Sequence, residues 1–174
     1  MIQNGIRAKR LRPTDRIEGC GAVVLFAAVR LLPINWASAL GGAVARQVGP
    51  LLGISKRARI NLRRALPGLP TTEIERIVTG MRDNLGQVAA EYPHLREIRV
   101  FAPDGRVETN GFEYMDQAVA GGRRMIIFSG HLANWEIGAL AAAQYGVRVT
   151  EIYRAPNNPL VDQLISRFRS DRGE

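Results

Sequence analysis

Apolar residues recur at helical spacing in the middle of the chain. Six of them are three or four residues apart: Ile74, Ile77, Val78, Met81, Leu85 and Val88. This spacing predicts an amphipathic helix. Thr72 and Glu75 predict a capping box that opens the helix, and Pro93 predicts its end. A second, basic helix is predicted over residues 54–65, ending before Pro67.

Beyond residue 105 the pattern changes to short apolar runs separated by helical segments. Strands are expected over 106–110, 124–129 and 147–153, and helices over 112–120, about 135–145 and from about 159 onward. Alternating strands and helices are typical of an α/β fold with a parallel sheet. The predicted fold class is therefore α/β. An N-terminal helical arm, residues 1–50, precedes an α/β domain, residues 51–174.

The arm is both basic and apolar. Up to Arg64 the chain has twelve lysines and arginines against two acids, a net charge of +10. From Ala65 onward twelve arginines face fourteen acids, a net charge of −2, which together give the chain's +8. This asymmetry favours contact with an anionic membrane surface. A role of the arm in nucleic-acid binding is a weaker alternative, because its arginines interleave with apolar residues.

Two uncharged runs, 19–29 and 31–45, are separated by Arg30 and interrupted by Pro33. A membrane-spanning helix needs about 20 predominantly apolar residues, so anchoring in the membrane interface is the preferred interpretation. Side chains expected among the acyl chains are Val24, Leu25, Phe26 and Trp36. A tilted span from near Ile17 and a buried helical hairpin remain alternatives. The basic residues Arg7, Lys9, Arg10, Arg12 and Arg16 before the apolar run predict the cytoplasmic side.

Composition limits the remaining classes. The chain has 174 residues, 46% of them hydrophobic, which is enough for one domain with a core. Cys20 is its single cysteine, so neither an intrachain disulfide nor a thiolate metal cluster is expected. His94, next to Pro93, is interpreted as a surface residue.

The segment Ser129-Gly130-His131-Leu132-Ala133-Asn134-Trp135-Glu136 carries the candidate chemistry. His131 is a possible general base, and Glu136 a carboxylate that could orient it. On one continuous helix, positions five apart point about 140° from each other. The two side chains can therefore meet only if His131 stays in a loop that folds over a helix beginning near Asn134. Asn134 suits that start as a cap, and the helix dipole favours Glu136 in the first turn.

The interval His131 to Glu136 resembles the H-x4-D/E signature of the lysophospholipid acyltransferase superfamily. The surrounding residues resemble bacterial lipid A biosynthesis acyltransferases, the family of late lauroyl and myristoyl transferases. A second block resembles the family's Y-R-x-x-x-N-P-L-x-D segment: Tyr153, Arg154, Asn157, Asn158, Pro159, Leu160, Asp162 and, beyond it, Arg167. A weaker likeness includes Arg59, Asn61, Leu62, Pro67 and a helix ending in Glu91.

The resemblance implies acyl transfer from an acyl carrier protein thioester to a hydroxyl of a lipid A precursor, at the cytoplasmic face of the bacterial inner membrane. His131 and Glu136 would be the catalytic residues, and backbone N–H groups of the following helix could hold the oxyanion. Candidate substrate contacts are Arg154, Arg167, Arg169 and Asn134. Asn134 and Asn158 are interpreted as caps or turn formers rather than as catalytic residues. No metal or cofactor is implied. The carrier protein or lipid headgroups could bind the basic patch Lys56, Arg57, Arg59, Arg63 and Arg64.

Family members continue beyond the equivalent of residue 174, so the resemblance implies that the α/β domain is incomplete. Two other functions remain open. One is acyl transfer to another lipid acceptor, such as a lysophospholipid. The other is an inactive remnant that binds membranes without catalysis.

Overall fold

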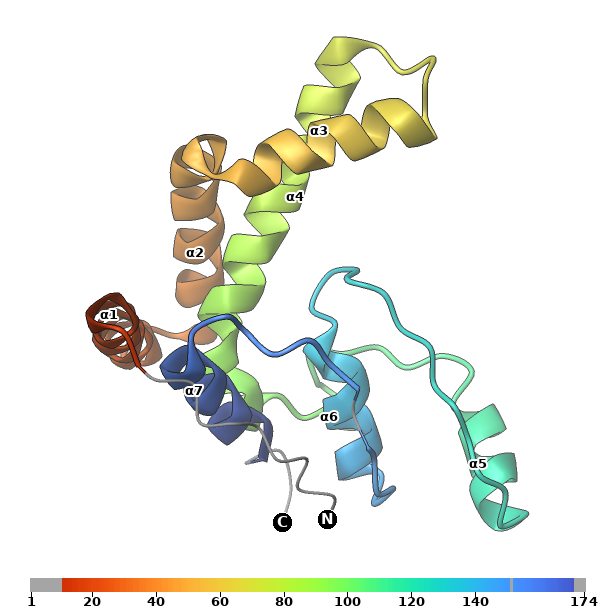
Figure 1. Ribbon diagram of the computed structural model, residues 1–174. Helices are drawn as coiled ribbons and strands as arrows, with labels where there is room; N and C mark the ends of the chain where they lie inside the picture. Colours follow the sequence, from red (N-terminus) through yellow and green to blue (C-terminus); the bar gives the residue numbers. More distant parts are fainter. Residues whose placement is uncertain (1–10, 151, 171–174) are drawn as a thin grey trace.

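The computed structural model describes residues 11–150 and 152–170 (Figure 1). These residues form seven α-helices and two short 3-10 helices: α1 (Pro13–Arg30), α2 (Ile34–Val48), η1 (Gly49–Leu51), α3 (Gly53–Ala65), α4 (Thr71–Glu91), η2 (Tyr92–Glu97), α5 (Glu113–Ala120), α6 (Glu136–Gln144) and α7 (Pro159–Ser170). The described part of the chain contains no strand. The α/β prediction is therefore wrong, and the architecture is helical.

The three segments expected to be strands have no sheet to join. Described residues of 106–110, 124–129 and 147–153 lie outside regular structure, and Glu151 falls outside the described residues. Several of their apolar side chains are exposed to solvent: Ile126 is 82% exposed, Phe128 89% and Ile152 100%. Val107 differs, because it packs against the core. A strand is stabilised by paired neighbours and a covered face. An apolar run in the sequence indicates that a segment tends to be buried, but it provides neither a neighbouring strand nor an element that covers its face.

The predicted helices are confirmed at nearly their expected bounds. α3, α4, α5, α6 and α7 correspond to the five helical segments expected after residue 50. The capping box is wrong, because Pro70 precedes α4 and no side chain caps it. Glu75 instead accepts two hydrogen bonds from Arg59 of α3, at 2.6 and 2.8 Å. This ion pair joins the middle of α3 to the beginning of α4.

Helix α4 is the longest helix of the described residues, and α2 and α3 pack along it. α2 lies along it, and the two backbones touch where Gly41 meets Gly86. A Cβ added at Gly86 would lie 2.1 Å from the carbonyl oxygen of Gly41, so only glycine fits. The small residues Ala45 and Ala90 flank this crossing. Small side chains thus set the distance between α2 and α4.

The core lies at the C-terminal end of α4. Its buried side chains come from α4, η2, the following segment and α6: Val88, Tyr92, Leu95, Ile98, Val100, Leu140 and Ala141. Phe26 of α1 and Phe168 of α7 pack against this cluster and meet edge to face, with ring centroids 5.5 Å apart. The end of α4 therefore lies in the core that α6 and α7 share.

His94 belongs to this buried region, so its interpretation as a surface residue is wrong. It is 1% exposed, because η2 turns it under α1. Its Nδ1 lies 3.2 Å from each carboxylate oxygen of Glu97, and its Nε2 lies 3.3 Å from the Val29 carbonyl.

Within residues 11–48, the N-terminal segment of the chain forms α1 and α2. Among residues 11–150 and 152–170, no helix is both long and apolar enough to cross a membrane. Arg7, Lys9 and Arg10 lie outside the described residues. Large apolar side chains remain exposed along α1 and α2: Ile17, Val23, Val24, Leu25, Trp36, Leu40, Val44 and Val48. Phe26 differs from the other predicted lipid contacts, since it packs against Phe168.

Candidate active site

A loop joins the extended segment after α5 to the first turn of α6. His131 lies in this loop and is exposed. Ala133 has a positive φ of 44°, a backbone conformation that residues other than glycine rarely adopt. The side-chain oxygen of Asn134 accepts the N–H of Glu136 at 3.1 Å. Asn134 thus satisfies the first N–H of α6, but it lies one residue before the N-cap position, which Trp135 occupies without a side-chain cap bond. His131 lies in the loop and Glu136 in the first turn of α6, as the sequence predicts.

Glu136 is buried, with 2% of its surface exposed, and binds three side chains. The hydroxyl of Tyr92 donates to its Oε1 at 2.5 Å, and the indole N–H of Trp135 donates to the same oxygen at 3.0 Å. Arg169 of α7 donates to both oxygens, from Nε at 3.1 Å and from Nη2 at 2.7 Å. The carboxylate therefore connects α6, η2 and α7.

This buried cluster shifts the pKa of two of its members. Burial raises the pKa of Tyr92 to about 12, and its hydrogen bond to Glu136 acts in the same direction. Burial alone would lower the pKa of Arg169, but its bonds to Glu136 and the charges beside it outweigh burial and raise it. The phenol stays neutral and the guanidinium charged over any ordinary pH range.

The structure does not join His131 directly to Glu136, although it describes both residues. The imidazole instead meets the ring of Trp135 edge to face, with centroids 4.7 Å apart. Trp135 in turn donates its indole N–H to Glu136. The histidine and the carboxylate are thus connected through the indole.

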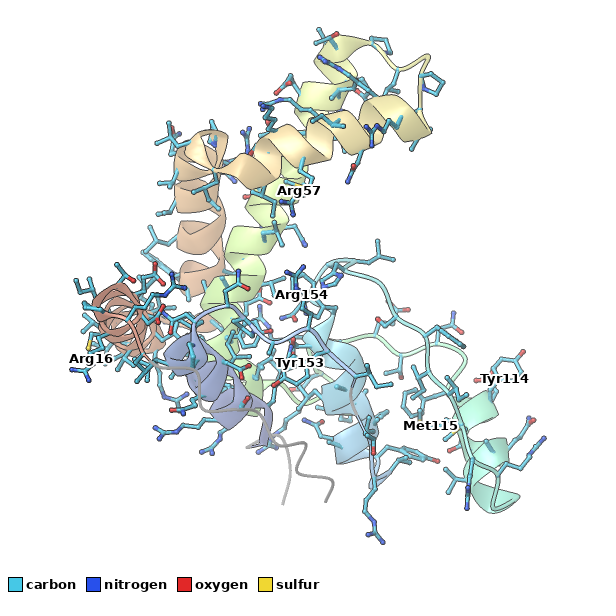
Figure 2. The ribbon with its side chains drawn as sticks, viewed as in Figure 1. Arg16, Arg57, Tyr114, Met115, Tyr153 and Arg154 are labelled. Carbon is cyan, nitrogen blue, oxygen red and sulfur yellow. The ribbon has the colours of Figure 1, made fainter. Side chains whose placement is uncertain are left out.

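The candidate arginines lie in different settings. Arg154 is exposed and lies beside Tyr153 on the segment leading to α7 (Figure 2). Arg167 is exposed on α7. Arg169 is committed to Glu136, and its guanidinium carbon lies 4.7 Å from the centre of the Tyr153 ring. Tyr153 and Arg169 connect the second sequence block to the first.

Asn158 has the capping role considered for it. Its Oδ1 accepts the N–H groups of Leu160 at 2.9 Å and Val161 at 3.4 Å, in the first turn of α7. Its amide donates to the carbonyl of Asp15 and to Glu18, both at 2.9 Å. The asparagine of the second block thus ties the start of α7 to α1.

Comparison with protein families shows to which family the chain belongs. The model of the bacterial lipid A biosynthesis acyltransferase family matches residues 7–174. The chain belongs to this family. It is therefore an acyltransferase, and the family implies an acyl donor and a lipid A acceptor in general. Searches of curated proteins and of solved structures find no match.

Two backbone donors at the start of α6 of the acyltransferase are already in use. The N–H of Glu136 binds the Asn134 side chain, and the N–H of Ile137 binds the Asn134 carbonyl at 3.2 Å. An oxyanion at this helix start would have to displace these bonds or use other donors. In the described residues, His, Cys, Asp and Glu form no group of three or more suited to a metal.

An open pocket of about 410 Å³ adjoins the loop of the acyltransferase. Ala133 and Asn134 form one wall of it. The rest of its lining is mainly apolar, with three charged side chains: Ile34, Glu91, Ile98, Arg106, Val107, Glu108 and Ile137. It is an open hollow on the surface beside the loop rather than an enclosed cavity.

Sequence reasoning missed the residues that hold Glu136 and the loop. Tyr92 lies at the junction of α4 and η2, where only the following proline marked a change of structure. Trp135 donates its indole N–H to Glu136, a contact that the sequence pattern does not indicate. Glu91 was noted only as a helix end, although Asn134 donates to it at 2.6 Å. A buried carboxylate requires donors, but their positions along the chain follow from tertiary packing.

Proposed function

We propose that the acyltransferase moves a fatty acyl group from an acyl carrier protein thioester to a hydroxyl of a lipid A precursor, at the cytoplasmic face of the bacterial inner membrane. The observation that carries this proposal is an exposed His131 in a loop that is fixed to the buried end of α6. The family match over residues 7–174 supports the substrate class.

In the proposed reaction, His131 accepts the proton of the acceptor hydroxyl while that oxygen attacks the thioester carbonyl carbon. The carbon–sulfur bond then breaks, an ester forms, and the carrier's thiolate takes the proton back from His131. General-base help of this kind is typically worth about 10²- to 10⁴-fold. The exposure of His131 allows a lipid-borne hydroxyl to reach the imidazole.

Glu136 contributes to this reaction through its neighbours. Its carboxylate accepts the indole N–H of Trp135, and the Trp135 ring contacts the imidazole of His131 edge to face. Glu136 thereby helps to keep the imidazole in position. A direct bond between the carboxylate and the imidazole would require the loop to move, and hydrogen bonds in active sites often tighten when substrate binds. The negative charge would then also stabilise the imidazolium.

Exposed arginines would bind the anionic parts of the substrates. Arg154 suits a phosphate of the lipid A precursor, because a guanidinium matches phosphate geometry. Arg167 is a further candidate on α7. Exposed basic residues of α3 suit an acidic carrier protein: Lys56, Arg57, Arg63 and Arg64. Arg59 is less available, because Glu75 pairs with it.

Residues 1–50 would form the membrane-associating arm and residues 51–174 the remaining acyltransferase part. Since α2 packs along α4, the arm would contact lipid through its outward face. Trp36 of α2, 72% exposed, and Leu25 of α1, 60% exposed, are available for this contact. Apolar side chains inserted beside basic ones are typical of helices in the membrane interface.

A radiolabelled acyl-transfer assay with vesicles tests the proposal. The purified chain is given acyl carrier protein thioester or acyl coenzyme A as donor, and a lipid A precursor or a lysophospholipid as acceptor. We expect acylated lipid A precursor only from the carrier-protein donor. Transfer from either donor to the lysophospholipid alone would contradict the proposed acceptor, and equal use of both donors would contradict the proposed carrier.

A further inference from the structure

We propose that Glu91, at the C-terminal end of α4, is a positioning residue for acyl transfer, because it holds the His131 loop in place. The inference rests on the proposed function, since that function makes His131 the general base. Glu91 itself does not touch the reacting groups. It acts through Asn134, three residues after the histidine.

Both carboxylate oxygens of Glu91 are occupied. Oε2 accepts the side-chain amide of Asn134 at 2.6 Å, and Oε1 accepts the hydroxyl of Ser38 at 2.7 Å. Ser38 lies on α2, so three segments meet at one carboxylate: α2, the end of α4 and the loop. The amide of Asn134 donates to Glu91 while its oxygen caps Glu136. Glu91 therefore fixes the orientation of the cap itself.

A second side chain of α4 holds the same loop. The amide of Asn84 donates to the carbonyl of Ala133 at 3.1 Å. Asn84 and Glu91 are seven residues apart, two helical turns, so they lie on the same face of α4. Together they bind two consecutive loop residues.

The backbone of the loop explains why such anchors are needed. The positive φ of Ala133 costs free energy for a residue with a Cβ, and such strain persists only where surrounding contacts impose it. The bonds from Asn84 to Ala133 and from Glu91 to Asn134 flank this turn. Without them the turn would relax, and His131, two residues before Ala133, would leave its place beside Trp135.

The test compares steady-state kinetics of wild type, Glu91→Ala and Glu91→Gln in the vesicle assay. Misplacement of a catalytic group by about 1 Å can cost about 10²-fold in rate. We therefore expect Glu91→Ala to lower kcat by about 10- to 100-fold with little change in KM. A glutamine can accept from Asn134 and donate to Ser38, so Glu91→Gln should recover most of the lost kcat.

Glu75→Ala is the matched control, because it removes an ion-paired glutamate from the other end of the same helix. It should leave kcat at the wild-type value. If Glu91→Ala does not fold, Asn84→Ala takes its place in the test. Asn84→Ala removes only the hydrogen bond to the Ala133 carbonyl, and we expect the same loss of kcat from it.

Wild-type kcat in a folded Glu91→Ala or Asn84→Ala variant would overturn the inference. A Glu91→Gln variant whose kcat is as low as that of Glu91→Ala would also overturn it. The negative charge of Glu91, rather than its hydrogen bonds to the loop, would then be what kcat depends on. His131→Ala separates the two proposals. If it is inactive while Glu91→Ala is fully active, only the positioning role fails. If His131→Ala is as active as wild type, the proposed function fails, and the inference fails with it.

Discussion

At the scale of single residues, the acyltransferase depends on a buried carboxylate. Glu136 is 2% exposed and carries its charge next to Arg169, whose side chain is 19% exposed. Removing one partner of such a pair is strongly destabilising, because the other charge stays buried and unpaired. The pair therefore fixes where α6 meets α7.

Arg169→Gln should lower the free energy of unfolding by about 3 kcal/mol. Urea denaturation followed by circular dichroism measures this change. Arg76→Gln is the control, since Arg76 forms an exposed pair with Glu73, and such pairs are worth about 1 kcal/mol or less. An equal and small effect of both substitutions would contradict a buried charge at Glu136.

The raised pKa of Tyr92 predicts how the free energy of unfolding changes at alkaline pH. Folding raises its pKa from 10.0 to about 12, so between these values the unfolded chain loses the phenol proton first. The unfolded state then binds fewer protons, and stability falls as pH rises. The contribution of Tyr92 is complete below about pH 10 and is lost through about pH 12.

Thermal unfolding of wild type and Tyr92→Phe should show this loss. The melting temperature of wild type should exceed that of the variant near pH 9, and the difference should shrink as pH approaches 12. A difference that stays constant would mean that the phenol is not held neutral by folding.

At the scale of elements, the sequence predicted helices well and strands wrongly. Apolar residues three and four apart mark a helix that can satisfy its own backbone, and the helix predicted around Ile74 and Val88 is confirmed as α4. The run over 124–129 indicated an apolar extended segment, but a sheet needs partners that no local pattern encodes. The Asn134 cap was predictable for the same local reason. The bonds from Tyr92 and Arg169 to Glu136 were not, because they join elements far apart in sequence.

The crossing of α2 and α4 yields a prediction with an internal control. Gly86→Ala places a methyl group against the carbonyl of Gly41 and should cost about 1–3 kcal/mol of unfolding free energy. Gly80→Ala, on the same helix with open space around it, should stabilise by about 0.5–1 kcal/mol. Chemical denaturation of both variants measures the pair. Similar effects of both would exclude the close α2–α4 crossing.

At the scale of the whole molecule, exposed apolar side chains occur on the arm as well as on the segments beyond it. Trp36 is 72% exposed on α2, and Tyr114 is equally exposed on α5. Figure 2 shows Tyr114 far from α1, which carries the label Arg16. The two aromatic side chains therefore distinguish a membrane contact of the arm from nonspecific adhesion.

Binding to vesicles that contain anionic lipid should weaken in Trp36→Asp and remain unchanged in Tyr114→Asp. Burial of a large apolar side chain is worth about 1.5–3 kcal/mol, so a loss of about tenfold or more is expected for Trp36→Asp. Vesicle flotation or co-sedimentation, with the protein quantified by a method that does not use tryptophan fluorescence, measures the affinity for the vesicles. Equal weakening by both variants would contradict an arm-directed contact.

The most direct test of the account compares kcat/KM of wild type, His131→Ala and His94→Asn for transfer from acyl carrier protein thioester to a lipid A precursor. The chain has two histidines, one exposed in the loop and one buried beneath α1. His131→Ala should lose about 10²-fold or more while staying folded. His94→Asn should lose stability but keep the activity of its folded fraction. Activity that survives in His131→Ala would contradict the assignment of this loop as the active site.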